Sequence, residues 1–250
     1  MEFLIAIHKL DFVKFGQSIA HRNQKNTNTI LKRKIIQTLD GSTTIHIEEW
    51  DECYHSRFGA IQEAQHVFIK NGLSLFENST ISILEIGFGT GLNAFITFLE
   101  SKKLNQTIDY TGVEAYPVSP AEVQLMNYVP ELNAENESDI FEKMHECHWE
   151  EPIILREDFI FTKRKQFFDE IEDIEKFDMI YFDAFGFDVQ PELWSTTIFQ
   201  KMYNALKPKG VLVTYAARGV VKRSMIEVGF TVEKLEGPPG KREMFRARKE

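Results

Sequence analysis

The 250-residue chain has few cysteines, no long apolar run and no low-complexity tract. Its two cysteines, Cys53 and Cys147, lack the paired spacing of a zinc site, so we expect reduced thiols and no bound metal. The sequence alone leaves a disulfide between them open. The apolar run at residues 3–7 is too short for a signal-peptide core or a membrane span. These features favour a cytoplasmic protein without a membrane partner.

The chain also lacks an overall excess of positive charge. Its net charge of −9 argues at first against a nucleic-acid partner, because phosphates are bound through Lys and Arg. The charge is unevenly spread: residues 201–250 contain 12 Lys and Arg against 5 Asp and Glu, a net of +7, which leaves −16 on the first 200 residues. A basic C-terminal fifth is either a solvated surface or a phosphate site, and both explanations are open at this point.

Length and composition indicate one folded domain with room for a small appendage. The hydrophobic fraction of 43% and the aromatic fraction of 12% are those of a folded protein. Residues 1–30 end in a polar stretch without periodicity and predict a loose extension. Residues 32–50 predict a hairpin with a type I′ turn at Asp40-Gly41, and a helix is expected at residues 57–70.

Strands and helices alternate from residue 81 onward. Strands are expected at 81–87, 108–115, 152–158, 177–185 and 210–217, with helices at 92–101, from about 120, and at 194–206. This order predicts a Rossmann-like α/β fold with a mostly parallel sheet, and the last residues predict an antiparallel C-terminal hairpin. We therefore expect a main domain at residues 76–250, preceded by a small β-rich N-terminal extension at residues 1–75.

The stretch EIGFGTGLN holds three glycines at alternate positions, Gly87, Gly89 and Gly91, where the first parallel strand turns into a helix. Glycines there let a ligand lie against the main chain at the carboxyl edge of the sheet. A nicotinamide-binding G-x-G-x-x-G would need its third glycine at position 92, which is leucine. Glu85 would repel a pyrophosphate but can pair with an ammonium group. The pattern resembles motif I of the class I methyltransferases and implies S-adenosylmethionine as cofactor.

Further acidic residues fall at the ends of the following strands. Glu114 ends the second strand, where a carboxylate can accept hydrogen bonds from both hydroxyls of a ribose. Asp158 follows the segment expected as the third strand, and there the resemblance implies a hydrogen bond to the adenine amino group, with Phe159 beside the ring. Asn93, at the start of the helix after the glycines, is the remaining candidate for cofactor binding.

Asp183 ends the fourth expected strand, within the aromatic segment FDMIYFDAFGFDVQPELW. A carboxylate beside a sulfonium methyl can hold an amine, accept its proton and direct its lone pair at the methyl carbon. Positioning and desolvation of the nucleophile supply much of the rate in such a transfer. We therefore expect Asp183 to be the catalytic residue.

Several segments together resemble the bacterial tRNA 5-(aminomethyl)uridine methyltransferase family, the methyltransferase half of the bifunctional enzymes that make 5-methylaminomethyl-2-thiouridine at the tRNA wobble position. They are YHSRFGAIQEAQHVFIKNGL, EIGFGTGLN, VEAYPVSP, DAFGFDVQPELW and the C-terminal region through GPPGKREM, and the similarity spans residues 34–248. The resemblance implies methyl transfer from S-adenosylmethionine to the primary amine of 5-aminomethyl-(2-thio)uridine. The FAD-dependent oxidase half is not expected in this chain, so a separate enzyme would supply the amine.

The resemblance also implies how the substrate loop is built. Asp183 matches the catalytic aspartate of the family, and Pro191 and Trp194 match the frame of the substrate loop. Phe185-Gly186-Phe187 stands where members usually have Phe-Ala-Pro. The additional ring, Phe187, can stack on the uracil of a flipped wobble base, with Phe185 beside it.

Two other regions are implied to contact the substrate. The N-terminal segment helps close the site in the family, which makes Tyr54, His55 and Glu63 candidates for the pocket. Basic residues near the C-terminus are expected to follow phosphates of the anticodon stem-loop. These are Arg218, Lys222, Arg223, Lys241, Arg242, Arg246 and Arg248.

Two alternatives stay open on sequence grounds. The first is a methyltransferase of the same fold that acts on a small-molecule or protein amine. The second is a catalytically inactive protein that binds nucleosides or RNA, although the joint presence of Glu85, the three glycines, Glu114 and Asp183 argues against it.

Overall fold

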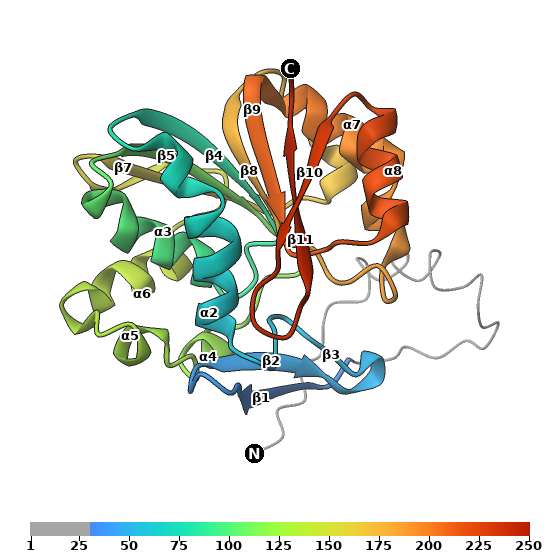
Figure 1. The fold of residues 1–250 in the computed structure, drawn as a ribbon. Coiled ribbons are helices and arrows are strands. Elements are labelled where there is room, and N and C mark those ends of the chain that lie inside the picture. The colour runs from blue at the N-terminus through green and yellow to red at the C-terminus, as the bar shows by residue number, and fades with distance from the viewer. Residues whose placement is uncertain (1–30) are drawn as a thin grey trace.

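The computed structural model describes residues 31–250, so the loose extension expected at residues 1–30 lies outside the described part. Its strands form two sheets, one of three strands and one of eight. In the small antiparallel sheet, β2 (Thr43–Ile47) pairs with both β1 (Arg33–Gln37) and β3 (Glu52–Cys53). Figure 1 shows this sheet lying below the large one, beside the loop that joins β10 and β11.

The large sheet has the strand order β10-β11-β9-β8-β4-β5-β7-β6. Its central strands β7, β5, β4, β8 and β9 are parallel, while β6, β10 and β11 add antiparallel pairs at the two edges. This confirms the Rossmann-like fold with its antiparallel C-terminal hairpin. The strands are β4 (Thr80–Ile86), β5 (Thr107–Val113), β6 (Ile153–Arg156), β7 (Phe159–Arg164), β8 (Phe177–Phe182), β9 (Leu206–Thr214), β10 (Thr231–Glu236) and β11 (Glu243–Arg248).

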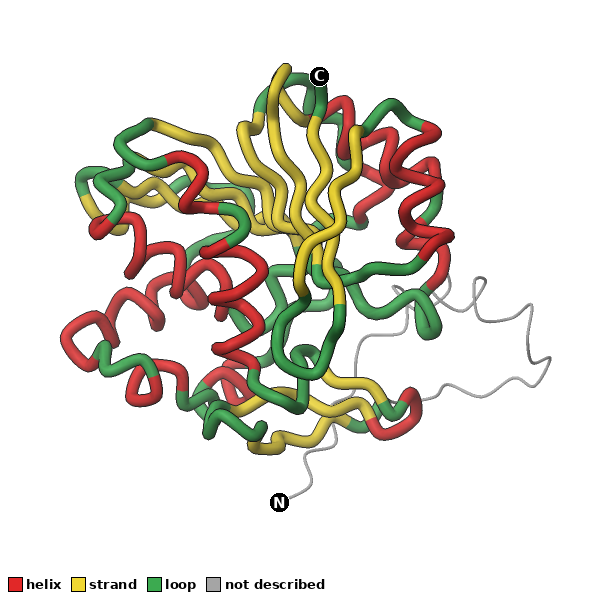
Figure 2. Tube along the Cα trace, viewed as in Figure 1, coloured by secondary structure: helices red, strands yellow, loops and turns green. Residues whose placement is uncertain are grey.

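Helices cover both faces of the large sheet (Figure 2). One face carries α2 (Ala60–Ala64), which continues as the π-helix η2 (Gln65–Lys70), together with α3 (Leu92–Lys103) and α6 (Ser138–Glu146). The other carries α7 (Thr196–Ala205) and α8 (Gly219–Glu227). The short helices are η1 (Glu48–Trp50), η3 (Leu73–Phe76), α4 (Pro120–Val123), α5 (Tyr128–Glu131), η4 (Glu135–Glu137), η5 (Phe168–Glu170) and η6 (Pro191–Trp194).

Alternate residues of the central strands supply two separate apolar cores. In β8, Tyr181 packs with α3 and η2 on one face, whereas Ile180 and Phe182 pack with α7 and α8 on the other. Because both faces are buried, the sequences of these strands are continuous apolar runs. Residues 60–73 belong to the same core as β4, so the packing shows no division at residue 75.

Three local expectations need correction. The hairpin between β1 and β2 has a five-residue loop in which only Gly41 has a positive φ, so the turn is not type I′. Asp40 stabilises this loop instead, since its Oδ1 accepts hydrogen bonds from the Thr38 hydroxyl and the Ser42 amide. The helix expected at 57–70 begins at Ala60, and the one expected from about residue 120 ends after four residues.

The third expected strand is also assigned differently. The segment at residues 153–156, β6, is an antiparallel edge strand, and β7 is the parallel neighbour of β5. The turn that carries Asp158 therefore lies at the amino ends of the parallel strands, where the Asp158 carbonyl accepts a hydrogen bond from Ile108 at the start of β5. Phe159 is fully buried in the core. Neither residue lies at the carboxyl edge, so their assignment to the cofactor site was wrong.

Two other features concern the environment of the chain. Cys53 and Cys147 are both free thiols. Within residues 31–250, no helix is both long and apolar enough to cross a membrane.

The strand assignment can be tested by stability. Phe161 on β7 is fully buried, whereas Ile154 on β6 is 75% exposed. We expect Phe161→Ala to lower the free energy of unfolding by about 3–5 kcal/mol, because it leaves a cavity in the core, and Ile154→Ala to change it by less than about 0.5 kcal/mol. Urea unfolding of both variants measures the difference. Equal losses would contradict this topology.

Candidate active site

A cleft of about 430 Å³ opens at the carboxyl edge of the large sheet, where it faces the small sheet. The glycine loop after β4, the ends of β5 and β8, and side chains of the small sheet line it. Its lining includes Arg33, Tyr54, Gly87, Gly89, Asn93, Glu114, Asp183 and Phe185. The structure thus brings together most of the residues that the sequence assigned to cofactor binding and catalysis.

The glycine loop runs so close to its neighbours that side chains do not fit. Gly87, Gly89 and Gly91 all have positive φ, at 90°, 50° and 76°. A Cβ at Gly87 would lie 2.6 Å from the Asp183 carbonyl oxygen, and one at Gly91 would lie 2.8 Å from His145 Nε2. The loop therefore presents bare backbone to the cleft, as a ligand lying against the main chain requires.

Glu85, the acid before this loop, is completely buried. Neither of its carboxylate oxygens has a hydrogen-bond partner among residues 31–250. Burial, to which the nearby Asp183 adds, raises the pKa of Glu85 well above its usual value, while Tyr110 and Asn93 oppose this rise. A buried acid without a partner beside a bare backbone loop fits a cationic ligand, such as the ammonium group of S-adenosylmethionine.

Glu114 lies at the end of β5 on the rim of the same cleft. The backbone N–H of Gly89 donates to its Oε2 at 3.0 Å, and that of Tyr116 donates to its Oε1 at 2.8 Å. These two bonds fix the carboxylate while leaving acceptor capacity for the hydroxyls of a ribose, since each oxygen can accept a second hydrogen bond.

The loop after β7 supplies residues that sequence reasoning missed. The residues that line the cleft at the carboxyl end of β7 are Phe167, Phe168 and Asp169. Asp158 was expected at this place. The segment FIFTKR, which precedes this loop, has buried residues at alternate positions and contains the signal for the true parallel strand.

Asp183 directly follows β8, and its backbone N–H donates to the Ile86 carbonyl at 2.9 Å. The Asn93 amide donates to its Oδ2 at 2.8 Å. Burial, with the negative charge of Glu63, raises the pKa of Asp183 to about 7, against the opposing effects of Asn93 and Lys241. A carboxyl group of this kind can exchange a proton near neutral pH.

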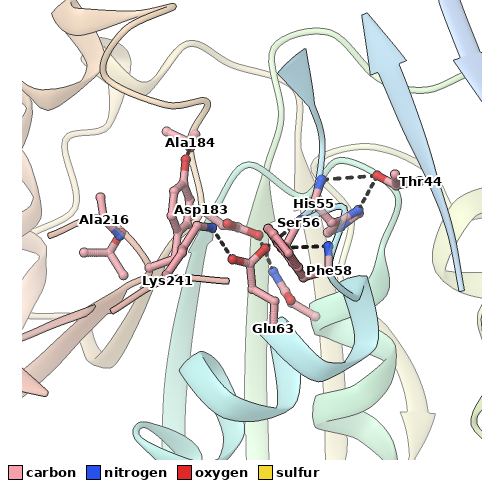
Figure 3. A network of polar contacts seen from close by, with 12 residues as sticks. Thr44, His55, Ser56, Phe58, Glu63, Asp183, Ala184, Ala216 and Lys241 are labelled. Atoms are coloured by element: carbon pink, nitrogen blue, oxygen red, sulfur yellow. Dashed lines mark hydrogen bonds and ion pairs between the residues drawn. The ribbon is translucent and has the colours of Figure 1, made fainter. Parts of the chain in front are cut away.

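A second cavity, of about 600 Å³, opens beyond the Asp183 turn. Tyr54 and His55 line both cavities, while Glu63, Phe187, Lys241 and Arg242 line only the second. Figure 3 shows the side chains of Asp183, Glu63 and Lys241 converging, with Lys241 in an ion pair with Glu63. The two cavities thus meet near the expected catalytic residue.

The N-terminal segment contributes aromatic and neutral groups to this junction. The ring of Tyr54 meets that of Phe185 edge to face, with 5.0 Å between centroids. His55 Nδ1 lies 3.0 Å from the Thr44 hydroxyl, and burial lowers the pKa of His55 to about 4. His55 is therefore neutral at physiological pH and does not supply a positive charge to the site.

The other residues that were expected to bind the substrate lie in different surroundings. Trp194 is buried, with 1% exposed, and its indole donates to the Phe185 carbonyl at 2.8 Å, so it supports the loop from within the core. Phe187 lies below the Arg218 guanidinium, 5.6 Å from ring centroid to Cζ, in the second cavity. The Arg242 side chain is 90% exposed at the mouth of this cavity.

A family model described as S-adenosyl-L-methionine-dependent methyltransferase matches residues 135–250. This segment contains Asp183 and the C-terminal hairpin, and the cofactor named in its description agrees with the glycine loop and the buried acid ahead of it. Residues 135–250 thus match the S-adenosyl-L-methionine-dependent methyltransferases, and the chain is similar to MnmC proteins. Curated relatives of this chain have the printed name tRNA 5-methylaminomethyl-2-thiouridine biosynthesis bifunctional protein MnmC.

The relative from Marinomonas sp. (strain MWYL1) is 29% identical over 214 residues, which cover 80% of this chain and 31% of that protein. The relative from Leptospira borgpetersenii serovar Hardjo-bovis (strain JB197) is 30% identical over 217 residues, which cover 79% and 32%. The chain therefore spans about a third of the length of the curated relatives that it matches.

Solved structures support the same fold. The crystal structure of MNMC2 from Aquifex aeolicus superposes with a TM-score of 0.71 at 22% identity, covering 97% of this chain and 78% of that one. Spermidine synthase from Thermotoga maritima gives a TM-score of 0.54 at 14% identity, covering 90% and 71%. The superposition on spermidine synthase shows that an enzyme with a different name shares the fold of most of this chain.

The role of Glu85 can be tested on the protein without substrate. We expect Glu85→Gln to weaken S-adenosylmethionine binding roughly 10- to 100-fold, because the ammonium group loses its counter-ion. The same change should raise the thermal midpoint of the ligand-free protein. A carboxyl group whose pKa is raised by folding makes the folded protein less stable as the pH rises above the pKa of that group in the unfolded chain. Glutamine does not ionise and has no such effect.

Calorimetric titration and thermal unfolding at pH 5 and pH 8 measure these two effects, and the gain in midpoint should be larger at pH 8. Glu100→Gln, on the partly exposed face of α3, is the matched control. Unchanged affinity in Glu85→Gln would exclude this acid from the cofactor site.

Proposed function

We propose that the chain methylates the primary amine of 5-aminomethyl-(2-thio)uridine at the wobble position of tRNA. The curated relatives are named for biosynthesis of 5-methylaminomethyl-2-thiouridine in tRNA, and about 80% of this chain aligns with a third of each. One observation supports an amine as the acceptor: the carboxyl group of Asp183, with a pKa of about 7, lines the cofactor cleft close to Glu63 and Lys241, which line a second cavity (Figure 3).

Asp183 is placed to act on such an amine. Its Oδ2 is held by Asn93, and its Oδ1 has no hydrogen-bond donor among residues 31–250. S-adenosylmethionine, when bound, supplies a methyl group on a positively charged sulfur. The free Oδ1 would hold the amine and take its proton, which would leave the nitrogen lone pair directed at the methyl group that the cofactor would supply. The aromatic rings of Tyr54 and Phe185 exclude water from this point.

The surface around the second cavity fits an RNA acceptor. Arg57, Arg218 and Arg242 line its mouth, and more than half of each side chain is exposed. Exposed guanidinium groups can follow phosphates while the target base enters the cavity, where Phe187 offers a ring for stacking. A separate enzyme would supply the aminomethyl group, and tRNA would be the macromolecular partner.

The reaction is tested with tRNA from cells that lack this protein. We expect incubation with labelled S-adenosylmethionine to place the label in 5-methylaminomethyl uridines, identified by nucleoside analysis. Ribonuclease treatment of the substrate should abolish incorporation. Label in a protein or a small amine, or persistence after ribonuclease, would point to another acceptor, and absence of S-adenosylmethionine binding would indicate an inactive protein.

The role of Asp183 predicts a specific pH dependence. Its carboxylate form accepts the proton, and this form increases as the pH rises through about 7, so kcat/KM should rise with a midpoint near that value. Asp183→Asn should lower kcat by roughly 10²- to 10⁴-fold and remove this limb, while S-adenosylmethionine still binds.

Initial rates across pH, under conditions in which chemistry limits turnover, measure both effects. An unchanged profile in Asp183→Asn would show that another group accepts the proton.

A further inference from the structure

Glu63 and Lys241 meet across the mouth of the second cavity, although 178 positions separate them in the chain. Glu63 comes from α2 and Lys241 from the loop between β10 and β11, and both point toward Asp183 (Figure 3). Glu63 is held in place on its other side, because the Ser56 N–H donates to Oε2 at 2.8 Å. Its carboxylate is only 8% exposed, whereas the Lys241 side chain is 32% exposed, so the ion pair is partly shielded from solvent.

The loop of the C-terminal hairpin fixes the direction of Lys241. Gly240 has a φ of 83° and packs against the Phe58 ring so closely that a Cβ there would overlap the ring. The following residue turns inward, with Lys241 Nζ 3.9 Å from the Tyr215 ring centroid, whereas Arg242 points to solvent. The Tyr215 hydroxyl donates to the carbonyl of Ala184, so this ring joins Lys241 to the Asp183 turn.

Asp183 is a competing partner for this ammonium. Its Oδ1 has no donor among residues 31–250, and Lys241 already acts on it electrostatically. An ammonium group bound to Asp183 would fill the place of the substrate's amine and would make the carboxylate a weaker base. The other titratable groups that face Asp183 bring no positive charge; they are Glu85 on β4, Tyr110 on β5 and Tyr215 after β9.

We propose that Glu63 is a positioning residue that holds Lys241 away from Asp183, so that the Asp183 carboxylate stays open to the substrate's amine. Glu63 does so with a carboxylate that is itself fixed by Ser56, while the Tyr215 ring supports the ammonium from below. This inference rests on the proposed function for the identity of the amine. The ionisation of Asp183 in the protein without tRNA does not depend on which amine is the substrate.

The ion pair predicts opposite effects for single and double substitutions. In Glu63→Gln, Lys241 loses its counter-ion and turns to Asp183, so the pKa of Asp183 should fall by about one unit or more. The value of kcat/KM at pH 8 should then fall by about tenfold or more, although Asp183 is ionised. Adding Lys241→Met removes the competing cation, so the double variant should be faster than Glu63→Gln alone, with its Asp183 pKa back near the wild-type value.

Carbon-13 NMR of aspartate-labelled full-length protein measures the titration without any tRNA, and Asp183→Asn identifies the resonance. Asp139→Asn is the control, because it breaks an exposed ion pair with Lys143 on α6, and neither residue lines either cavity. It should leave both the titration and the rate unchanged.

An Asp183 titration that is the same in Glu63→Gln as in the wild type would overturn the proposal, as would a double variant that is no faster than Glu63→Gln. If the titrations shift as expected and tRNA is not methylated, the positioning role stands and the proposed substrate is wrong.

Discussion

Burial of acidic groups at the carboxyl edge of the sheet is the constraint on which the rest of the site depends. Glu85 is the second-last residue of β4 and Asp183 directly follows the adjacent parallel strand β8, so the register that pairs these strands brings the two acids together. Burial raises the pKa of both groups, because neither is paired with enough positive charge to offset the loss of water. A fold that keeps such acids is adapted to ligands that bring cations, and a sulfonium cofactor and an amine are two of them.

The parts of the chain that close the site come from its two ends. The small sheet and α2 supply Tyr54 and Glu63, and the terminal hairpin supplies Lys241. Tyr54 lines both cavities, Glu63 and Lys241 line the second, and Asp183 lines the first. This arrangement explains how a common methyltransferase fold can acquire a particular acceptor: the sheet binds the methyl donor, and the added segments shape the place of the nucleophile.

Sequence reasoning succeeded where the signal is local. The glycine loop, Glu85, Glu114 and Asp183 could be placed because each directly follows or ends a strand with a clear apolar pattern. It failed where the answer depends on which strand pairs with which: β6 and β7 are both short apolar segments, and only the pairing shows that Asp158 lies at the opposite edge. The ion pair between Glu63 and Lys241 was equally out of reach, because Glu63 was assigned to the substrate pocket and Lys241 to the phosphates of tRNA, and nothing local indicated that they bind each other.

The raised pKa values also couple ligand binding to proton release. A cation bound in the cleft lowers the pKa of each nearby acid, and by linkage the same cation must bind more tightly as the pH rises and the acids ionise. Occupation of the cofactor site therefore favours the ionised form of Asp183, the form that the proposed methyl transfer requires. In the absence of a ligand, burial raises the pKa of both acids, which limits the cost of burying them, while Lys241 is paired with Glu63.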